Sequence, residues 1–143
     1  MYQKIMVPLD GSKLAECVFP YVKGLVQGKQ AKNLVFVRVI EPLRSVIGGE
    51  AVLTDEQIKK LEAEHRQAAE IYLRKVEGKV LNGNIAETLS RYATRKKMNV
   101  VVIATHGRSG VSRWVWGSVA DRLLRYSCVP ILVIRPRECS PSL

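Results

Sequence analysis

The stretch NVVVIATHGRSGVSRWVWGSV, residues 99–119, joins a short apolar run to a long segment of small and polar residues. The run at residues 99–105 is typical of a strand that is covered on both faces. The segment that follows is rich in glycine, and it ends at Gly117, directly before a predicted helix over residues 118–126. A strand, a glycine-rich loop and a helix in this order predict one unit of an α/β sheet.

The same alternation of strand and helix continues along the rest of the chain. Further strands are predicted over residues 4–10, 33–41, 78–83 and 129–136. Five strands that alternate with four helices predict a parallel sheet with right-handed crossovers. The expected fold is therefore α/β, a single doubly wound (Rossmann-like) five-stranded parallel sheet with helices on both faces. One domain is expected over residues 1–143, with a flexible tail at about residues 138–143.

The predicted helices have recognisable starts. Ser12 is a candidate N-cap for the first helix, which Pro20 should kink without abolishing. The sequence TDEQ, residues 54–57, is a capping box for a helix of about five turns. His65 falls on the apolar face of that helix, so we expect a side chain packed in the core or at its edge rather than a catalytic one. The next helix starts near Asn84.

The composition is that of an ordinary globular protein, with 47% hydrophobic and 25% charged residues. No apolar run approaches the roughly 20 residues of a membrane span, and the N-terminus enters a strand without a signal-peptide pattern. We expect a cytoplasmic protein with no membrane partner. The net charge of +10 is scattered along the chain without a nucleic-acid-binding motif. We therefore expect no nucleic acid partner, but a bias toward anionic ligands.

The ends of the first and fourth predicted strands carry the most informative residues. In open α/β sheets, ligands bind beyond the carboxyl ends of the strands, where the strand order reverses. If these two strands are neighbours, Asp10 and the glycine-rich loop line one crevice, with residues 38–40 on the other side. Asp10 could act as an acid or a metal ligand, but with no second carboxylate fixed nearby a ligand-orienting role is more economical.

The glycine-rich loop has the chemistry of a phosphate-binding site. Glycine lets the backbone approach a ligand, and Gly117 and Ser118 stand at a helix start, where free N–H groups face an anion. His106 and Arg108 can add charge or hydrogen bonds. A single glycine would more simply serve a turn, whereas small residues spread over so long a segment favour a ligand. No P-loop, GxGxxG, GxSxG or HExxH pattern is present.

Three stretches resemble the universal stress protein family: IMVPLDGS at residues 5–12, ATHGRSGVSRWVWGSVADRLLR at residues 104–125 and VPILVIR at residues 129–135. The nucleotide-binding pattern of that family is Gly, two residues, Gly, nine residues, then Gly-Ser or Gly-Thr. This chain matches the second part of the pattern with Gly107, nine residues at 108–116 and then Gly117-Ser118. At the position of the first glycine it has Ala104. The methyl group of Ala104 points either into the sheet, which is harmless, or toward the ribose and phosphates, which weakens binding.

The resemblance implies an adenine nucleotide, ATP or else ADP or AMP, with Mg or Mn between its phosphates. The adenine would lie against the backbone of Val39 and the apolar wall near Ile103 and Ala104. Asp10 would hold the ribose beside Pro8 and Leu9. The phosphates would lie on Gly107, Arg108, Gly117, Ser118 and Val119. The resemblance also implies a homodimer through the last strand, from Pro130 to Arg135.

Three functions stay open at this stage. The first is a dimeric ATP-binding stress or signalling protein with at most slow hydrolysis, because no residue is an obvious general base. The second is a member of that family that binds no nucleotide and acts through protein–protein interaction. The third is a nucleotide-dependent enzyme such as a transferase. The downstream partner and the inducing stress cannot be read from the sequence.

Overall fold

The computed structural model describes residues 2–28, 31–43, 54–73, 78–105 and 117–135. Its strands are all parallel, in the order β3-β2-β1-β4-β5. They are β1 (Lys4–Pro8), β2 (Asn33–Ile40), β3 (Gly78–Asn82), β4 (Val100–Ala104) and β5 (Ile131–Ile134). The predicted five-stranded parallel sheet is thus confirmed, and so is the neighbourhood of the first and fourth strands, which pair at Ile5–Val100 and Met6–Val101.

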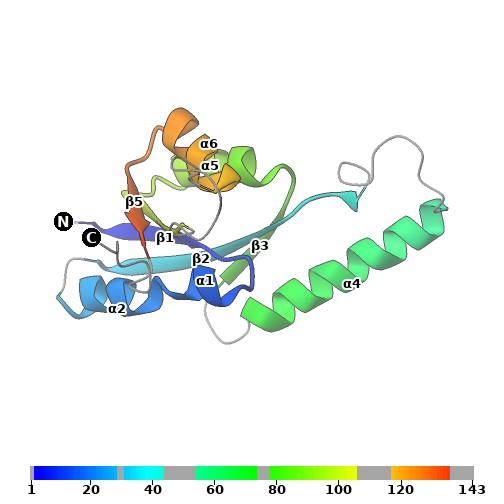
Figure 1. The fold of residues 1–143 in the computed structure, drawn as a ribbon, viewed down its shortest axis with the longest axis horizontal. Coiled ribbons are helices and arrows are strands. Elements are labelled where there is room, and N and C mark those ends of the chain that lie inside the picture. The colour runs from blue at the N-terminus through cyan, green and yellow to red at the C-terminus, as the bar shows by residue number, and fades with distance from the viewer. Residues whose placement is uncertain (1, 29–30, 44–53, 74–77, 106–116, 136–143) are drawn as a thin grey trace, which may run out of the picture.

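Helices cover both faces of the sheet (Figure 1). One face carries α1 (Lys13–Glu16) and α2 (Phe19–Gln27), and the other carries α5 (Ile85–Arg95) and α6 (Ser118–Tyr126). The central strands β1 and β4 are buried almost throughout, which explains their continuous apolar runs. Successive β1 residues alternate between two cores: Ile5 and Val7 pack toward α1 and α2, and Met6 packs toward α5 and α6.

The first predicted helix is interrupted, not kinked. It ends at Glu16, where the Cys17 N–H donates to the Leu14 carbonyl at 3.1 Å, and α2 begins two residues after Cys17. Pro20 has no N–H to donate to the Glu16 carbonyl, and its ring would collide with that carbonyl in a continuous helix. The chain therefore restarts the helix with Pro20 in the first turn of α2, a position that tolerates proline.

The long helix α4 (Asp55–Leu73) begins at the predicted capping box. The Thr54 N–H donates to Gln57 Oε1 at 2.8 Å, and the Gln57 N–H donates to Thr54 Oγ1 at 3.3 Å. The expectation of a packed His65 is wrong, because residues 63–68 are all exposed. Figure 1 shows that α4 extends past the ends of the strands.

The predicted helix start near Asn84 is confirmed, whereas the predicted C-terminal tail is not described by the structure. Asn84 caps α5 as expected, with its Oδ1 accepting the Glu87 N–H at 3.3 Å. The expected tail at residues 138–143 lies outside the described residues, as do residues 44–53. None of the helices in the described segments combines the length and apolarity that a membrane crossing requires.

Candidate functional site

The chain topology brings three strand ends to one edge of the sheet. From β1 the chain builds outward through β2 and β3, then returns to the other side of β1 with β4 and β5. The strand order therefore reverses between β1 and β4, the position where open α/β sheets bind ligands. The first turns of α1, α5 and α6 lie at the same edge, and their residues line a common space with the ends of β1, β2 and β4.

A cleft of about 270 Å³ opens at this edge. Nine of the twelve residues predicted for the site line it: Pro8, Leu9, Asp10, Val39, Ile103, Ala104, Gly117, Ser118 and Val119. The remaining three, His106, Gly107 and Arg108, lie outside the described residues. The fold therefore assembles the predicted strand ends and the predicted helix start around one space.

Asp10 stands at the exposed rim of the cleft. Its Oδ1 accepts the Ser12 N–H at 2.8 Å, while Ser12 Oγ accepts the Ala15 N–H at 3.0 Å as the N-cap of α1. Between them Gly11 has a φ of +87°, and a Cβ there would lie 3.2 Å from Arg38 Nη1. The positive φ thus favours a glycine, and a Cβ there would also require the end of the Arg38 side chain to shift slightly. The tight turn holds the Asp10 carboxylate at the rim as a hydrogen-bond acceptor.

The backbone of Val39 faces the same space. The Leu9 N–H donates to the Val37 carbonyl at 2.9 Å, so the main-chain groups of Val37 point toward β1. The Ile40 carbonyl, one residue past Val39, accepts the Gly83 N–H on the β3 side. Because main-chain groups alternate sides along a strand, those of Val39 point to the β1 side. β1 ends at Pro8, opposite Val37, so Val39 presents its donor and acceptor beyond the end of β1.

The N-terminus of α6 forms another wall of the cleft. Gly117 is its N-cap and makes no side-chain cap hydrogen bond, and the Asp121 N–H donates to the Gly117 carbonyl at 2.9 Å. The N–H groups of the preceding residues, Ser118 to Ala120, precede the first intrahelical hydrogen bond and carry the positive end of the helix dipole. Gly117 has a φ of −42°, a value open to other residues, so a left-handed backbone is not the reason for glycine here.

Ala104 and Thr105 lie on opposite faces of the sheet. Ala104 is half-buried and packs against the core beneath α1 and α2, and it also lines the cleft. Thr105 follows it with only 2% of its surface exposed. Its side chain is on the face of Ile103, the one that α6 covers. The Thr105 N–H donates to the Ile134 carbonyl at 3.0 Å, which fixes the residue against β5.

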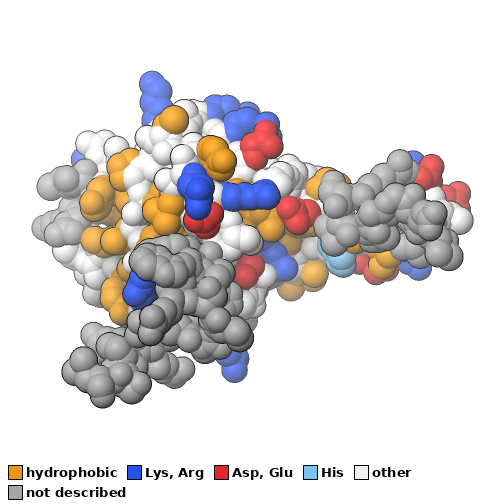
Figure 2. Space-filling model, turned by 45° about the horizontal axis from the view of Figure 1, so that its top comes forward, with side chains coloured by type: hydrophobic (Ala, Val, Ile, Leu, Met, Phe, Trp, Pro, Cys, Tyr) orange, Lys and Arg blue, Asp and Glu red, His pale blue; other side chains and the backbone are white. Residues whose placement is uncertain are grey.

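Charged side chains outside the cleft pair with one another along helix surfaces. Arg125 Nε lies 3.0 Å from Asp121 Oδ2, and Arg91 Nη1 lies 3.7 Å from Glu87 Oε1. Figure 2 shows Lys and Arg side chains in small groups on one face, several of them beside Asp or Glu, rather than in one basic patch. This distribution agrees with the scattered positions of the charged residues in the sequence.

Comparison with known proteins identifies the family. The family model described as the universal stress protein family matches residues 1–135. This chain belongs to the universal stress protein family. The sequence resemblance is thereby confirmed over nearly the whole chain.

Individual relatives agree with the family assignment. Universal stress protein MJ0531 of Methanocaldococcus jannaschii is 27% identical, over 94% of this chain and 83% of that protein. The structure of UspA from Lactobacillus plantarum superposes with a TM-score of 0.72 at 22% identity, covering 94% of this chain and 98% of the other. A universal stress protein in complex with cAMP gives a TM-score of 0.60 at 20% identity, covering 94% of this chain and 97% of the other.

In this universal stress protein the cleft also has walls that the sequence did not reveal. Eight further residues line it: Ser12, Leu14, Ala15, Val37, Ile85, Leu89, Thr105 and Ala120. Ile85 and Leu89 come from α5, outside the stretches that carry the family resemblance, and the packing of α5 on the sheet brings them here. Thr105 was within reach of sequence analysis, because it stands between Ala104 and His106 in the strand-to-loop junction.

Proposed function

We propose that the cleft binds an adenine nucleotide, ATP or else ADP or AMP. The observation that carries the proposal is the grouping of three chemically different walls around one space. An apolar wall suits a flat base, the rim carboxylate of Asp10 suits ribose hydroxyls, and the α6 N-terminus suits phosphate. A relative of the same fold described in complex with cAMP supports an adenine ligand.

The apolar wall and the Val39 backbone would hold the base. The apolar wall consists of core residues from the α5 and α6 side of the sheet that also line the cleft: Val37, Val39, Ile85, Leu89 and Ile103. The outward N–H and carbonyl of Val39 offer one donor and one acceptor, which matches the alternating acceptors and donors on the edge of adenine. This pairing would select a base by its hydrogen-bonding edge.

Asp10 and α6 would set the direction of the nucleotide. A carboxylate repels phosphate, so the phosphates should avoid the Asp10 rim and lie at the positive end of α6. Gly107, Arg108 and His106 would complete the phosphate side, with Mg or Mn between the phosphates. Since the φ of Gly117 does not require glycine, close approach of a phosphate is the reason we assign to its missing side chain.

The activity that we propose is binding, with at most slow hydrolysis, in a homodimeric stress or signalling module. The Asp10 carboxylate is the acidic group of the cleft lining, and we assign it to the ribose rather than to the activation of water. The second copy would pair along β5, which is an edge strand of the sheet and leaves Leu132 37% exposed.

Calorimetry tests the proposal directly. Protein stripped of bound ligand should release heat on titration with ATP, ADP, AMP or cAMP in the presence of magnesium, and GTP should bind more weakly because its base edge differs. Mass spectrometry of the released ligand should then identify the natural nucleotide. Protein that is purified empty and takes up none of these nucleotides would contradict the proposal, and would favour a role through protein–protein interaction.

A further inference from the structure

Thr105 carries a buried polar atom that no residue of the described chain satisfies. Its Oγ1 is buried without a hydrogen-bond partner, although the residue lines the cleft. A hydroxyl is one donor and two acceptors, and a buried hydroxyl without a partner is unfavourable by comparison with an apolar group of the same shape. An unsatisfied atom of this kind at the wall of a cleft indicates a partner that occupies the cleft.

The position of Thr105 shows which end of the cleft this partner occupies. Its side chain shares the sheet face of Ile103, which packs with Val119 and Ala120 of the first turn of α6. The hydroxyl therefore lies on the same side of the cleft as the N–H groups at the α6 N-terminus. The Thr105 N–H donates to the Ile134 carbonyl, so the backbone of Thr105 is held in place beside β5 and keeps its side chain on this face of the sheet.

We propose that Thr105 Oγ1 donates a hydrogen bond to a phosphate oxygen of the nucleotide, together with the N–H groups of α6. The inference rests on the proposed nucleotide function and adds a phosphate-binding residue to it. A hydroxyl is neutral, so it can bind an anionic oxygen inside a buried wall without the desolvation that a lysine there would require. Thr105 thus makes the site selective for phosphorylated ligands over the bare nucleoside.

The test compares Thr105→Val with Thr105→Ser by calorimetry, using ATP and adenosine as ligands. Valine keeps the shape of threonine and removes the hydroxyl, whereas serine keeps the hydroxyl. Thr105→Val should weaken ATP binding by about tenfold and leave adenosine binding unchanged, because a hydrogen bond to a charged oxygen is lost. Thr105→Ser should bind ATP like the unmodified protein. Thr88→Val is the control, because Thr88 is also buried but does not line the cleft.

Thermal unfolding without ligand separates this role from a structural one. If the hydroxyl has no partner in the ligand-free protein, Thr105→Val should keep or raise the Tm, because a methyl group is better suited to a buried site. A lower Tm with unchanged ATP affinity would mean that the hydroxyl is satisfied within the chain and would overturn the inference. Equal losses for ATP and adenosine would overturn it as well.

The failure of this inference differs from failure of the proposed function. If the unmodified protein binds ATP and Thr105→Val binds it equally well, only the role of Thr105 is rejected. If the unmodified protein binds neither ATP nor adenosine, the nucleotide function itself is rejected, and the role of Thr105 with it.

Discussion

Asp10 combines a fixed position with an exposed carboxylate. The hydrogen bond from the Ser12 N–H and the positive φ of Gly11 hold it at the rim of the cleft without burying it. Its removal should therefore affect ligand binding more than folding. In this respect Asp10 differs from the buried residues of the same cleft, whose replacement would also disturb the core.

Asp10→Ala should lower the affinity for ATP by about 1.5–3 kcal/mol, the range for hydrogen bonds to charged groups. Calorimetry measures the loss, and circular dichroism checks that the fold is retained. Asp10→Asn is the matched variant, because its amide oxygen can still accept the Ser12 N–H. A folded Asp10→Ala protein with unchanged affinity would remove Asp10 from the site.

Gly117→Val should abolish ATP binding while the protein stays folded. The φ of −42° is compatible with a side chain, so the backbone itself does not forbid the substitution. The expected loss comes from the valine side chain, which would occupy the space of the phosphates. Normal ATP binding by the folded variant would show that this glycine serves the chain rather than the ligand.

Ala104→Gly is the contrasting change, because it restores the glycine of the family pattern. Ala104 packs against the core beneath α1 and α2, so losing its methyl group should leave the ATP affinity equal or higher. The free energy of unfolding should fall by roughly 0.5–1 kcal/mol through added backbone freedom. Calorimetry and urea denaturation measure the two effects separately. A fall in ATP affinity would mean that the methyl group contributes to the site.

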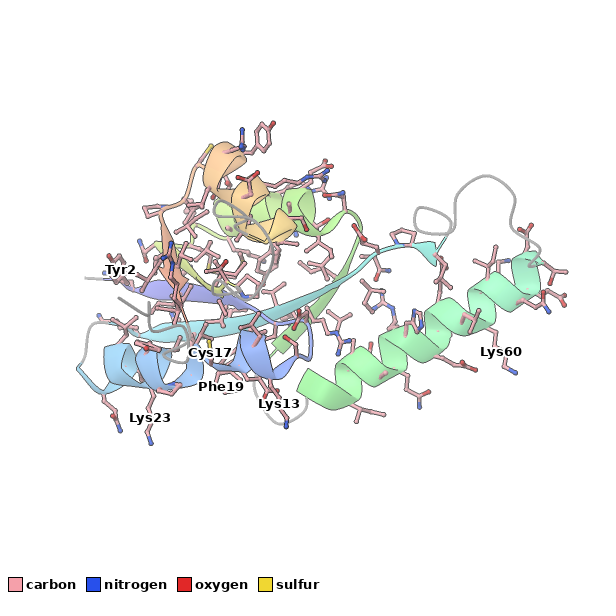
Figure 3. All side chains as sticks on the ribbon, viewed as in Figure 1. Tyr2, Lys13, Cys17, Phe19, Lys23 and Lys60 are labelled. Atoms are coloured by element: carbon pink, nitrogen blue, oxygen red, sulfur yellow. The ribbon has the colours of Figure 1, made fainter. Side chains whose placement is uncertain are left out.

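At the scale of secondary-structure elements, the junction of α1 and α2 shows how one residue divides a helix. Figure 3 shows Cys17 at this junction, while Lys13 and Lys23 point away from the sheet. Phe19 packs its ring on Phe36 of β2, edge to face, with centroids 5.7 Å apart. The break at Pro20 thus places the start of α2 against the sheet.

Burial raises the pKa of the Cys17 thiol above its ordinary value. The thiolate is the nucleophile in alkylation. At pH values below the raised pKa, iodoacetamide should therefore alkylate Cys17 more slowly than a cysteine with the ordinary pKa. Its rate should increase at higher pH. Because burial disfavours the thiolate, the folded protein is more stable with Cys17 in the thiol form. The free energy of unfolding should therefore fall slightly as the pH rises through the pKa of the folded state.

Peptide mapping of the alkylated protein measures the rate at each cysteine. Cys128 is exposed and supplies the internal comparison, and both Cys17 and Cys128 are free thiols in the described part of the chain. Cys17 should react more slowly than Cys128 in the folded protein, and at a similar rate after unfolding in urea. Equal rates in the folded protein would contradict the protection of Cys17.

At the scale of the whole molecule, the sheet has an open edge at β5. Only β4 pairs with β5 among the described strands, and Leu132 is exposed on it. Leu132→Lys should convert the proposed homodimer into monomer, because it places a charge at the contact. Light scattering at micromolar concentration measures the mass.

Leu124→Lys is the matched control for the dimer contact. Leu124 is 45% exposed on α6, so its replacement tests whether any exposed leucine has the same effect. We expect this variant to remain dimeric. If the unmodified protein is monomeric, or if both variants dissociate alike, β5 is not the dimer contact.

The sequence by itself determined the elements of this protein and the location of its candidate site. Strand periodicity, the capping box at Thr54, the helix start at Asn84 and the glycine pattern are local signals, because each depends on residues close together in the chain. The rule that connections in parallel sheets are right-handed then restricts the strand order. Local signals therefore placed Asp10 after a strand and Gly117 before a helix, and the pairing of β1 with β4 brought them to one cleft.

Only the tertiary structure decided which faces are covered and what lines the cleft. His65 has the spacing of a packed residue, but the structure leaves it exposed, while Ile58 and Ala69 of the same helix are buried. Ile85 and Leu89 reach the cleft because α5 packs on the sheet there, and neighbouring Ala104 and Thr105 face opposite cores. The physical reason is that burial and hydrogen bonding depend on elements distant in sequence, so a pattern shows that a side chain can be buried but not what will cover it.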